Sequence, residues 1–161
     1  WPLVTKNRCC VQANVLLASQ TGICKICDFG LSGMHVQANK STVGTPQFMS
    51  PEVLLGEAMD LKRADVYAFS ILLWQLLSRG CIPFEGCSTV TEMYNTVVIG
   101  NQRPDVASID PGHGDTEDVL SSLLRKCWAR EPSERPTFMD IVDVLAPMTA
   151  VVKKMGESDL S

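Results

Sequence analysis

The sequence has no surplus of positive charge and no long apolar run. Its 161 residues include 14 Lys and Arg against 18 Asp and Glu, which gives a formal net charge of −4. This balance disfavours a polyanionic partner such as nucleic acid or an anionic membrane surface. The longest apolar stretch, 69–77, is interrupted by Ser70 and Gln75 and falls far short of the ~20 residues that cross a bilayer. We therefore expect neither a nucleic-acid partner nor a membrane partner.

The chain also lacks the histidine and cysteine pairs of a zinc site. It has two histidines, and the pair Cys24-x-x-Cys27 has no second pair to complete a tetrahedral site. Residues three apart on a strand point to opposite faces, so this pair is poorly placed to share a metal ion. The seven cysteines are an odd number with no secretory segment before them. We expect reduced thiols, a cytoplasmic location and no zinc.

The composition is that of one globular core, with 45% hydrophobic and 20% charged residues. It excludes disorder, collagen and a small disulfide scaffold. Two short apolar segments around a glycine-containing turn, within 15–27, predict a β-hairpin. Residues 28–44 show no helical or strand period. The remainder predicts helices over 64–77, 89–99 and 116–128, with a last one starting at 136–137.

The apolar positions of these helices predict the core. The segment 64–77 is apolar on almost every face, which is typical of a helix running through the centre of a domain. Trp74 and Trp128 are expected to be core anchors. The later helices should turn two sets of residues inward, namely Val119, Leu120, Leu123, Leu124, Cys127 and Trp128 in one, and Phe138, Ile141, Val142, Leu145 and Met148 in the other. Residues after Lys153 should be a frayed tail.

Four motifs, each weak alone, occur in one order along the chain: 24–32 (CKICDFGLS), 44–52 (GTPQFMSPE), 64–70 (ADVYAFS), and 127–128 (CW) followed by 134–138 (ERPTF). Together they resemble the C-terminal lobe of a protein kinase, and most closely that of a tyrosine-kinase-like serine/threonine kinase. The resemblance implies a mainly α fold, a kinase C-terminal lobe with a short β-hairpin before the activation loop. It covers 7–148, with a catalytic-loop remnant at 7–14 and an activation segment at 28–52. Residues 1–6 are unassigned and 149–161 form the tail.

The resemblance also implies roles for residues around the hairpin and the loop that follows it. The activity of the family is ATP-dependent phosphoryl transfer to protein serine or threonine, with Mg²⁺ as cofactor and protein substrates as partners. Asp28 would chelate the magnesium ions and Asn14 would hold the second one, because carboxylate and amide oxygens suit this hard cation. Gly30 would give the backbone a pivot at the start of the activation loop.

The remaining implied roles concern the activation segment and the helices that hold it. Ser41 and Thr42 are the phosphorylation candidates, and Arg8 would clamp a phosphate there. Thr45 would lie against the substrate residue. Three residues would act structurally: Glu52 would pair with Arg135 in a buried ion pair, and Asp65 would accept backbone hydrogen bonds from the catalytic loop.

The sequence departs from the family at the catalytic loop. Counting back from Asn14 places Cys9 where the family has the catalytic aspartate, and Val11 where it has a lysine. A thiol is mostly protonated at pH 7, so Cys9 is a poor general base, and general-base assistance contributes ~10²–10⁴-fold to a rate. Catalysis through Cys9 is therefore expected to be lost or impaired.

No glycine-rich phosphate loop, strand lysine or partner glutamate precedes residue 7, so we expect the N-terminal lobe to be absent from this chain. A truncated or mispredicted reading frame and a truly degenerate kinase both explain this. Whether the chain is an enzyme therefore stays open. The alternative function is a pseudokinase-like scaffold for partner proteins, and a third possibility is that the chain does not fold stably.

Overall fold

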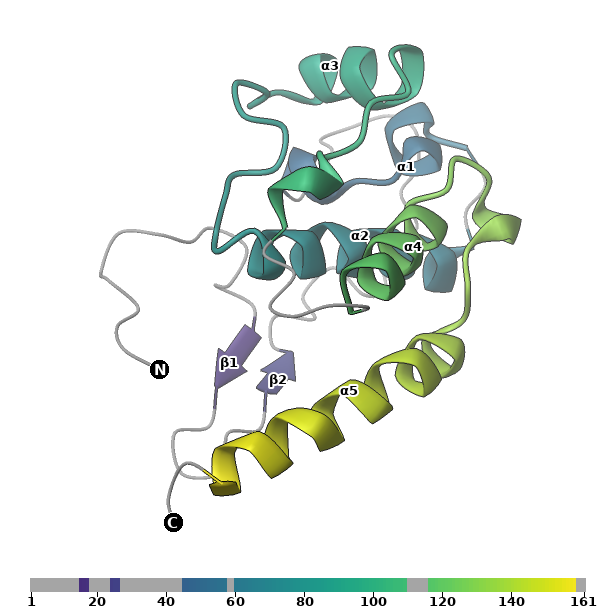
Figure 1. Ribbon diagram of the computed structural model, residues 1–161. Coiled ribbons are helices and arrows are strands. Elements are labelled where there is room, and N and C mark those ends of the chain that lie inside the picture. Colours follow the sequence, from purple (N-terminus) through teal and green to yellow (C-terminus); the bar gives the residue numbers. More distant parts are fainter. Residues whose placement is uncertain (1–14, 18–23, 27–44, 58–59, 110–115, 159–161) are drawn as a thin grey trace. The chain divides into compact units, whose positions relative to one another are not determined.

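A computed structural model describes residues 15–17, 24–26, 45–57, 60–109 and 116–158 (Figure 1). The chain divides into two units, residues 1–45 and 46–161, and each is described by itself. In the first unit, β1 (Val15–Leu17) and β2 (Cys24–Ile26) pair antiparallel, with Val15 opposite Ile26 and Leu17 opposite Cys24. The predicted hairpin is therefore present.

The second unit is helical throughout its described elements. It contains the 3₁₀ turns η2 (Pro46–Phe48), η4 (Val106–Ser108) and η5 (Pro132–Glu134), the π-helical segment η3 (Tyr94–Ile99), and the helices α1 (Pro51–Leu55), α2 (Leu61–Leu77), α3 (Val90–Met93), α4 (Thr116–Cys127) and α5 (Phe138–Ser158). The expected fold class, mainly α with a short hairpin, is confirmed. No described helix combines the length and the apolar character needed to cross a membrane.

Local sequence signals set where these helices begin and end. Asp60 caps α2, because its Oδ1 atom accepts hydrogen bonds from the backbone N–H groups of Lys62 and Arg63 at 3.0 and 3.3 Å. Thr89 and Glu92 form a reciprocal capping box at the start of α3. Gly56 ends α1 in the left-handed conformation, with φ of 68°. These caps satisfy backbone groups that a helix terminus would otherwise leave unpaired.

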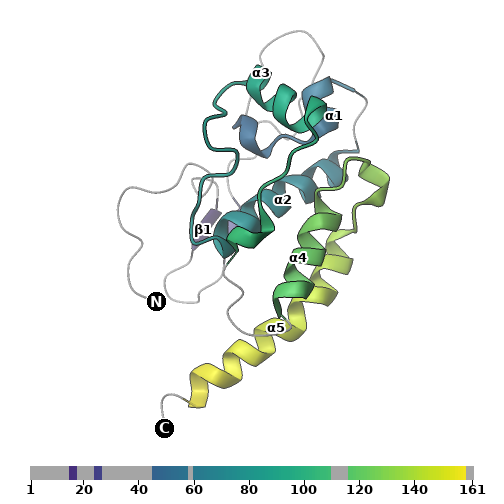
Figure 2. The ribbon, with the colours of Figure 1, turned by 45° about the horizontal axis from the view of Figure 1, so that its top comes forward.

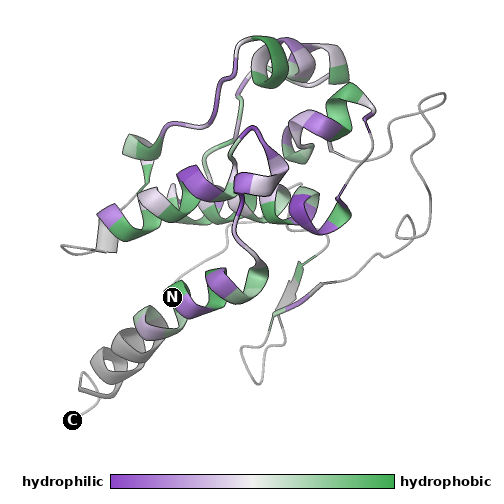
Figure 3. Cartoon of the chain, turned by 90° about the vertical axis from the view of Figure 1, so that its right-hand side faces the viewer, coloured by the Kyte–Doolittle hydropathy of each residue, from purple (hydrophilic) through white to green (hydrophobic). Residues whose placement is uncertain are grey.

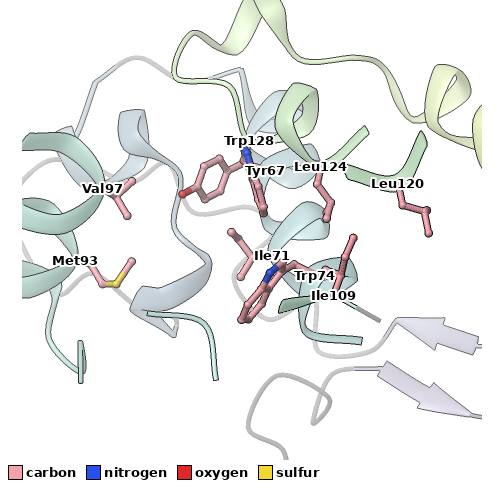
Figure 4. Close-up of a cluster of buried hydrophobic side chains, with 9 residues drawn as sticks. All are labelled: Tyr67, Ile71, Trp74, Met93, Val97, Ile109, Leu120, Leu124 and Trp128. Atoms are coloured by element: carbon pink, nitrogen blue, oxygen red, sulfur yellow. The ribbon is translucent and has the colours of Figure 1, made fainter. Parts of the chain in front are cut away.

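The helix α2 supplies residues to both hydrophobic clusters of the unit. In the larger cluster, α2 side chains face Met93 and Val97 on one side and Leu120, Leu124 and Trp128 on another (Figure 4). Val66 of α2 joins Leu123, Cys127 and Ile141 in the smaller cluster. This position explains why the sequence of α2 is apolar on almost every face. Its side chains supply three of the nine buried residues of the larger cluster, namely Tyr67, Ile71 and Trp74.

The predicted core anchors are confirmed, but three positions predicted to face inward are exposed. Trp74 and Trp128 are buried. Val119 of α4 and Phe138 and Val142 of α5 are instead 41%, 43% and 53% exposed. They lie at the edges of their apolar faces, and Phe138 meets only the edge of the Phe69 ring, at 5.8 Å between centroids. A helical period places a residue on a side of a helix but does not say how wide the neighbouring contact is.

The last helix is longer than expected, because α5 continues to Ser158 where a frayed tail was predicted. Hydrophilic and hydrophobic residues alternate along its coloured part (Figure 3). Its buried side is Ile141, with Val144 and Leu145 partly buried, and these residues pack on the smaller cluster. The helix lies beside α4 near its own N-terminal end (Figure 2).

Candidate functional site

The structure describes only part of the predicted site. Thr45, Glu52, Asp65 and Arg135 lie in the described residues, and seven predicted site residues lie outside them: Arg8, Cys9, Asn14, Asp28, Gly30, Ser41 and Thr42. Val11 also lies outside. The predicted phosphate clamp, magnesium ligands and phosphorylation positions therefore remain predictions. The described residues show how the end of the predicted activation segment is anchored on the helices.

Glu52 and Arg135 form a buried, two-point ion pair across 83 residues of sequence. Arg135 donates from Nη1 to Glu52 Oε1 at 2.7 Å and from Nη2 to Glu52 Oε2 at 2.8 Å. The other three N–H groups of the guanidinium donate to the backbone carbonyls of Ala129, Arg63 and Arg130. All five donors of Arg135 are thus used, which is the condition under which a buried guanidinium is tolerated.

The electrostatics of Glu52 follow from this pairing. Burial alone would raise the pKa of Glu52, since it disfavours the charged form. Hydrogen bonds from Arg135, together with the attraction of its positive charge, outweigh burial and hold the pKa of Glu52 below its ordinary value of 4.5. Glu52 is therefore a carboxylate at neutral pH, and the pair keeps opposite charges in the interior.

Arg63 links the Glu52–Arg135 pair to the start of α2. Its backbone carbonyl accepts a hydrogen bond from Arg135 at 2.9 Å, and its own guanidinium donates back to the carbonyl of Arg135. The pair of arginines therefore joins the first turn of α2 to the segment between η5 and α5. With Glu52 in the first turn of α1, three elements meet at one guanidinium.

A third arginine, Arg103, extends this cluster through Tyr67. The Arg103 and Arg135 guanidinium carbons lie 5.5 and 5.3 Å from the centroid of the Tyr67 ring. Tyr67 is fully buried, and burial raises the pKa of its hydroxyl to about 12 despite the two nearby cations. Burial also disfavours the charged form of Arg103, and so lowers its pKa. The ring therefore stays neutral between two positive charges.

Arg103 was not predicted as a site residue, and it anchors the connection between η3 and η4. Its Nε donates to the Trp128 carbonyl at 2.8 Å, and its Nη1 donates to the Gln102 carbonyl at 2.7 Å. The sequence offered little signal for this role, because the partners are backbone carbonyls. The neighbouring Pro104 is buried in the structure, so this connection is packed at that point.

The segment that follows Thr45 is fixed to the helices by a side-chain hydrogen bond. Thr45 is exposed, and η2 begins at the next residue and contacts α2 and α3. Gln47 donates from Nε2 to the carbonyl of Cys87 at 2.6 Å, across 40 residues of sequence. Cys87 in turn contacts the Thr96 hydroxyl of η3, with 3.4 Å between Sγ and Oγ1. Residues 47–52 are thus held to the helices at both ends, by Gln47 and by Glu52.

Asp65 lies in the first turns of α2 and remains exposed. Although much of the side chain is exposed, the surrounding protein removes part of the water around its carboxyl, and this desolvation raises the pKa above the ordinary value of 3.8. Its predicted partner, the catalytic loop, lies outside the described residues, so the proposed hydrogen bonds stay a prediction.

The described residues contain no group of three or more His, Cys, Asp or Glu side chains placed to hold a metal ion. Four cysteines are described there as free thiols: Cys24 and Cys81 are exposed, Cys87 is half-buried and Cys127 is buried. Burial raises the pKa of Cys127 to about 11, so this thiol is unreactive at neutral pH.

Comparison with known proteins decides the family. The sequence model of the protein tyrosine and serine/threonine kinase family matches residues 8–145, which include both Glu52 and Arg135. The chain belongs to this protein kinase family. The resemblance drawn from the four motifs, all of which lie within the matched residues, is therefore confirmed.

Curated relatives agree with this assignment. The chain is 33% identical over 140 residues to the dual specificity protein kinase shkC of Dictyostelium discoideum, covering 84% of this chain and 26% of that protein. It is 34% identical over 147 residues to the serine/threonine/tyrosine-protein kinase HT1 of Arabidopsis thaliana, covering 89% and 35%. It is 33% identical over 155 residues to the Arabidopsis serine/threonine-protein kinase CTR1, covering 90% and 17%. The chain thus spans about a third or less of these kinases.

Proposed function

We propose that this chain is the protein-substrate-binding lobe of a serine/threonine protein kinase, and that its own phosphoryl transfer is lost or strongly impaired. The observation that carries the first part is the anchoring of residues 45–52. This segment is the end of the predicted activation segment. The Gln47 hydrogen bond holds one end of it, and the buried Glu52–Arg135 pair holds the other. A segment fixed in this way presents a stable surface to a peptide, with Thr45 exposed beside it.

The impaired chemistry is argued from the catalytic loop. A kinase places an aspartate beside the substrate hydroxyl, where it accepts the proton as the phosphoryl group is transferred. Cys9 occupies that position in this sequence and Val11 replaces the lysine two residues later. A neutral thiol neither accepts the proton efficiently nor orients the hydroxyl, and valine supplies no positive charge.

The residues proposed for the cofactor are Asn14 and Asp28, whose amide and carboxylate oxygens are the donors that Mg²⁺ prefers. ATP with its magnesium ions would supply the phosphoryl group. Asp28 and Asn14 would orient the phosphates, and Arg8 would neutralise a phosphate on Ser41 or Thr42. These assignments rest on the motif positions of the five side chains.

The experiment separates the two parts of the proposal. A chimera is made in which the residues of HT1 that precede its matching region are placed before residue 7 of this chain. We expect little transfer to dephosphorylated casein from the chimera as it stands. The double substitution Cys9→Asp with Val11→Lys should raise the rate about 10²–10⁴-fold, which is the usual contribution of a general base. Cys10→Asp, at the adjacent thiol, is the matched control.

Two outcomes would contradict the proposal. Equal rates with and without the double substitution would show that Cys9 and Val11 do not limit transfer. Turnover by the unmodified 161-residue chain would show that the chain is an active kinase by itself. The scaffold alternative predicts instead that the restored chimera stays inactive while the chain still binds partner proteins.

A further inference from the structure

The outward face of α4 forms an open groove that the kinase assignment does not use. The groove has a volume of about 580 Å³, within the ~300–1,000 Å³ of typical ligand sites. Its floor comes from one face of α4, because Asp118, Ser121, Ser122 and Arg125 recur at helical spacing. The opposite face of α4 bears Leu120, Leu123, Leu124 and Cys127 and is buried in the core.

The shape of the groove follows from the sizes of its side chains. Ser121 and Ser122 are short and lie in the middle of the floor, between longer charged residues towards the two ends of the helix. Val106 of η4 and Glu134 of η5 also line the groove, from the connections that precede and follow α4. The groove therefore has serine hydroxyls in its middle and charged side chains towards its two ends. This arrangement suits an extended polar chain.

The charges along the groove are separated by sign. Asp118 lies near the N-terminal end of α4, and Arg125 and Lys126 lie two turns later. Seven residues of helix span about 10 Å at 1.5 Å per residue. Glu134 of η5 adds a second negative charge to the lining. Along α4 the groove therefore runs from a negative end to a positive end, without one dominant charge.

This layout selects one kind of ligand. A polyanion would be repelled by Asp118 and Glu134, and a lipid chain would meet a lining with four charged side chains. An extended peptide advances about 3.3 Å per residue, so two of its side chains that lie 10 Å apart are three residues apart. We propose that the groove binds an extended peptide segment of a partner protein in which a Lys or Arg and a Glu or Asp are separated by three positions. The basic side chain lies at Asp118 and the acidic one at Arg125 and Lys126.

The test uses the full chain labelled with ¹⁵N and followed by NMR. Ten eight-residue peptides, built on a glycine and serine background, each carry one Lys and one Glu separated by one to five positions in either order. We expect saturable shifts of the backbone amides of Ser121, Ser122 and Arg125, largest for the spacing of three. Because the binding requires neither ATP nor transfer, its failure would leave the proposed function untouched.

Two variants and their controls make the test specific to the groove. Lys126→Glu should weaken binding of the Lys-x-x-Glu peptide about fivefold, the effect of one exposed ion pair of ~1 kcal/mol, and should improve binding of Lys-x-x-Lys. Lys62→Glu, an exposed lysine of α2, should change neither. Ser122→Trp fills the hollow without changing charge and should abolish binding, whereas Thr91→Trp on α3 should not.

The dispersion of the same spectra shows whether each variant is folded. If Lys126→Glu does not fold, Ser122→Trp still tests the groove. Equal binding at all spacings would overturn the inference, as would the absence of saturable shifts in the unmodified chain. Binding that survives Ser122→Trp would place the peptide elsewhere on the molecule.

Discussion

Arg135 anchors the end of the predicted activation segment. It donates to Glu52 and to the carbonyl of Arg63, which are far from it in sequence, and to the carbonyls of the nearby Ala129 and Arg130. Losing it would leave a buried carboxylate and three unpaired acceptors, whereas losing Glu52 leaves a cation that still has carbonyl partners. The loss of stability should therefore be larger at Arg135 than at Glu52, although both residues belong to the same ion pair.

We predict that Arg135→Met and Glu52→Gln each lower the free energy of unfolding by about 3–5 kcal/mol, with the larger loss for Arg135, because an uncompensated charge or acceptor stays buried. The double variant should lose less than the sum. Urea denaturation of the four chains measures these values. Arg125→Met, at an exposed arginine of α4, should stay within about 0.5 kcal/mol of the parent.

The free energy of unfolding at acidic pH should also depend on the Glu52–Arg135 pair. The pKa of Glu52 is lowered in the folded chain, so its contribution is fully present above the unfolded value near 4.5 and is lost as the pH falls through the folded value. The free energy of unfolding should therefore drop below about pH 4.5. Glu52→Gln should flatten this drop, and Glu131→Gln, at an exposed position, should not. An identical drop at acidic pH in all three chains would contradict the prediction.

At the scale of elements, the helical period of the sequence predicted α2, α3 with η3, α4 and α5. It did not predict which neighbouring helices would cover their apolar faces. The π-helical geometry of η3 has no period of its own in the sequence, so the segment was predicted simply as helix. Val119, Phe138 and Val142 were placed inward for the same reason: the pattern reports the character of a face, while the width of the contact depends on the neighbouring helix.

The capping box of α3 gives a prediction at this scale. Thr89→Ala removes the hydroxyl that accepts from the Glu92 backbone N–H at 3.2 Å. We expect a loss of about 0.5–2 kcal/mol in the free energy of unfolding, and Thr89→Ser should restore most of it. Thr91→Ala, two residues into the helix, should have a smaller effect. A loss at Thr91 equal to that at Thr89 would show that the cap is unimportant.

At the scale of the whole molecule, only some of the long-range contacts were predicted from the sequence. The family motifs led to the pairing of Glu52 with Arg135, which no local pattern connects. The cluster of Arg103 with Tyr67 was missed, because the acceptors of Arg103 are backbone carbonyls and any residue type supplies those. Gln47 was missed for the same reason, since its acceptor is the carbonyl of Cys87.

The position of α2 between both hydrophobic clusters has a consequence for the motions of the chain. Backbone amides in the middle of this helix, around Ile71 and Trp74, should exchange with deuterium only when the helical unit opens as a whole. We expect their protection to equal the global free energy of unfolding and to fall in parallel with it in Arg135→Met. Amides of the exposed connection at 81–82 should exchange faster through local opening. Mass spectrometry of deuterated peptides would measure both, and faster exchange in α2 than in that connection would contradict its role as the most protected element.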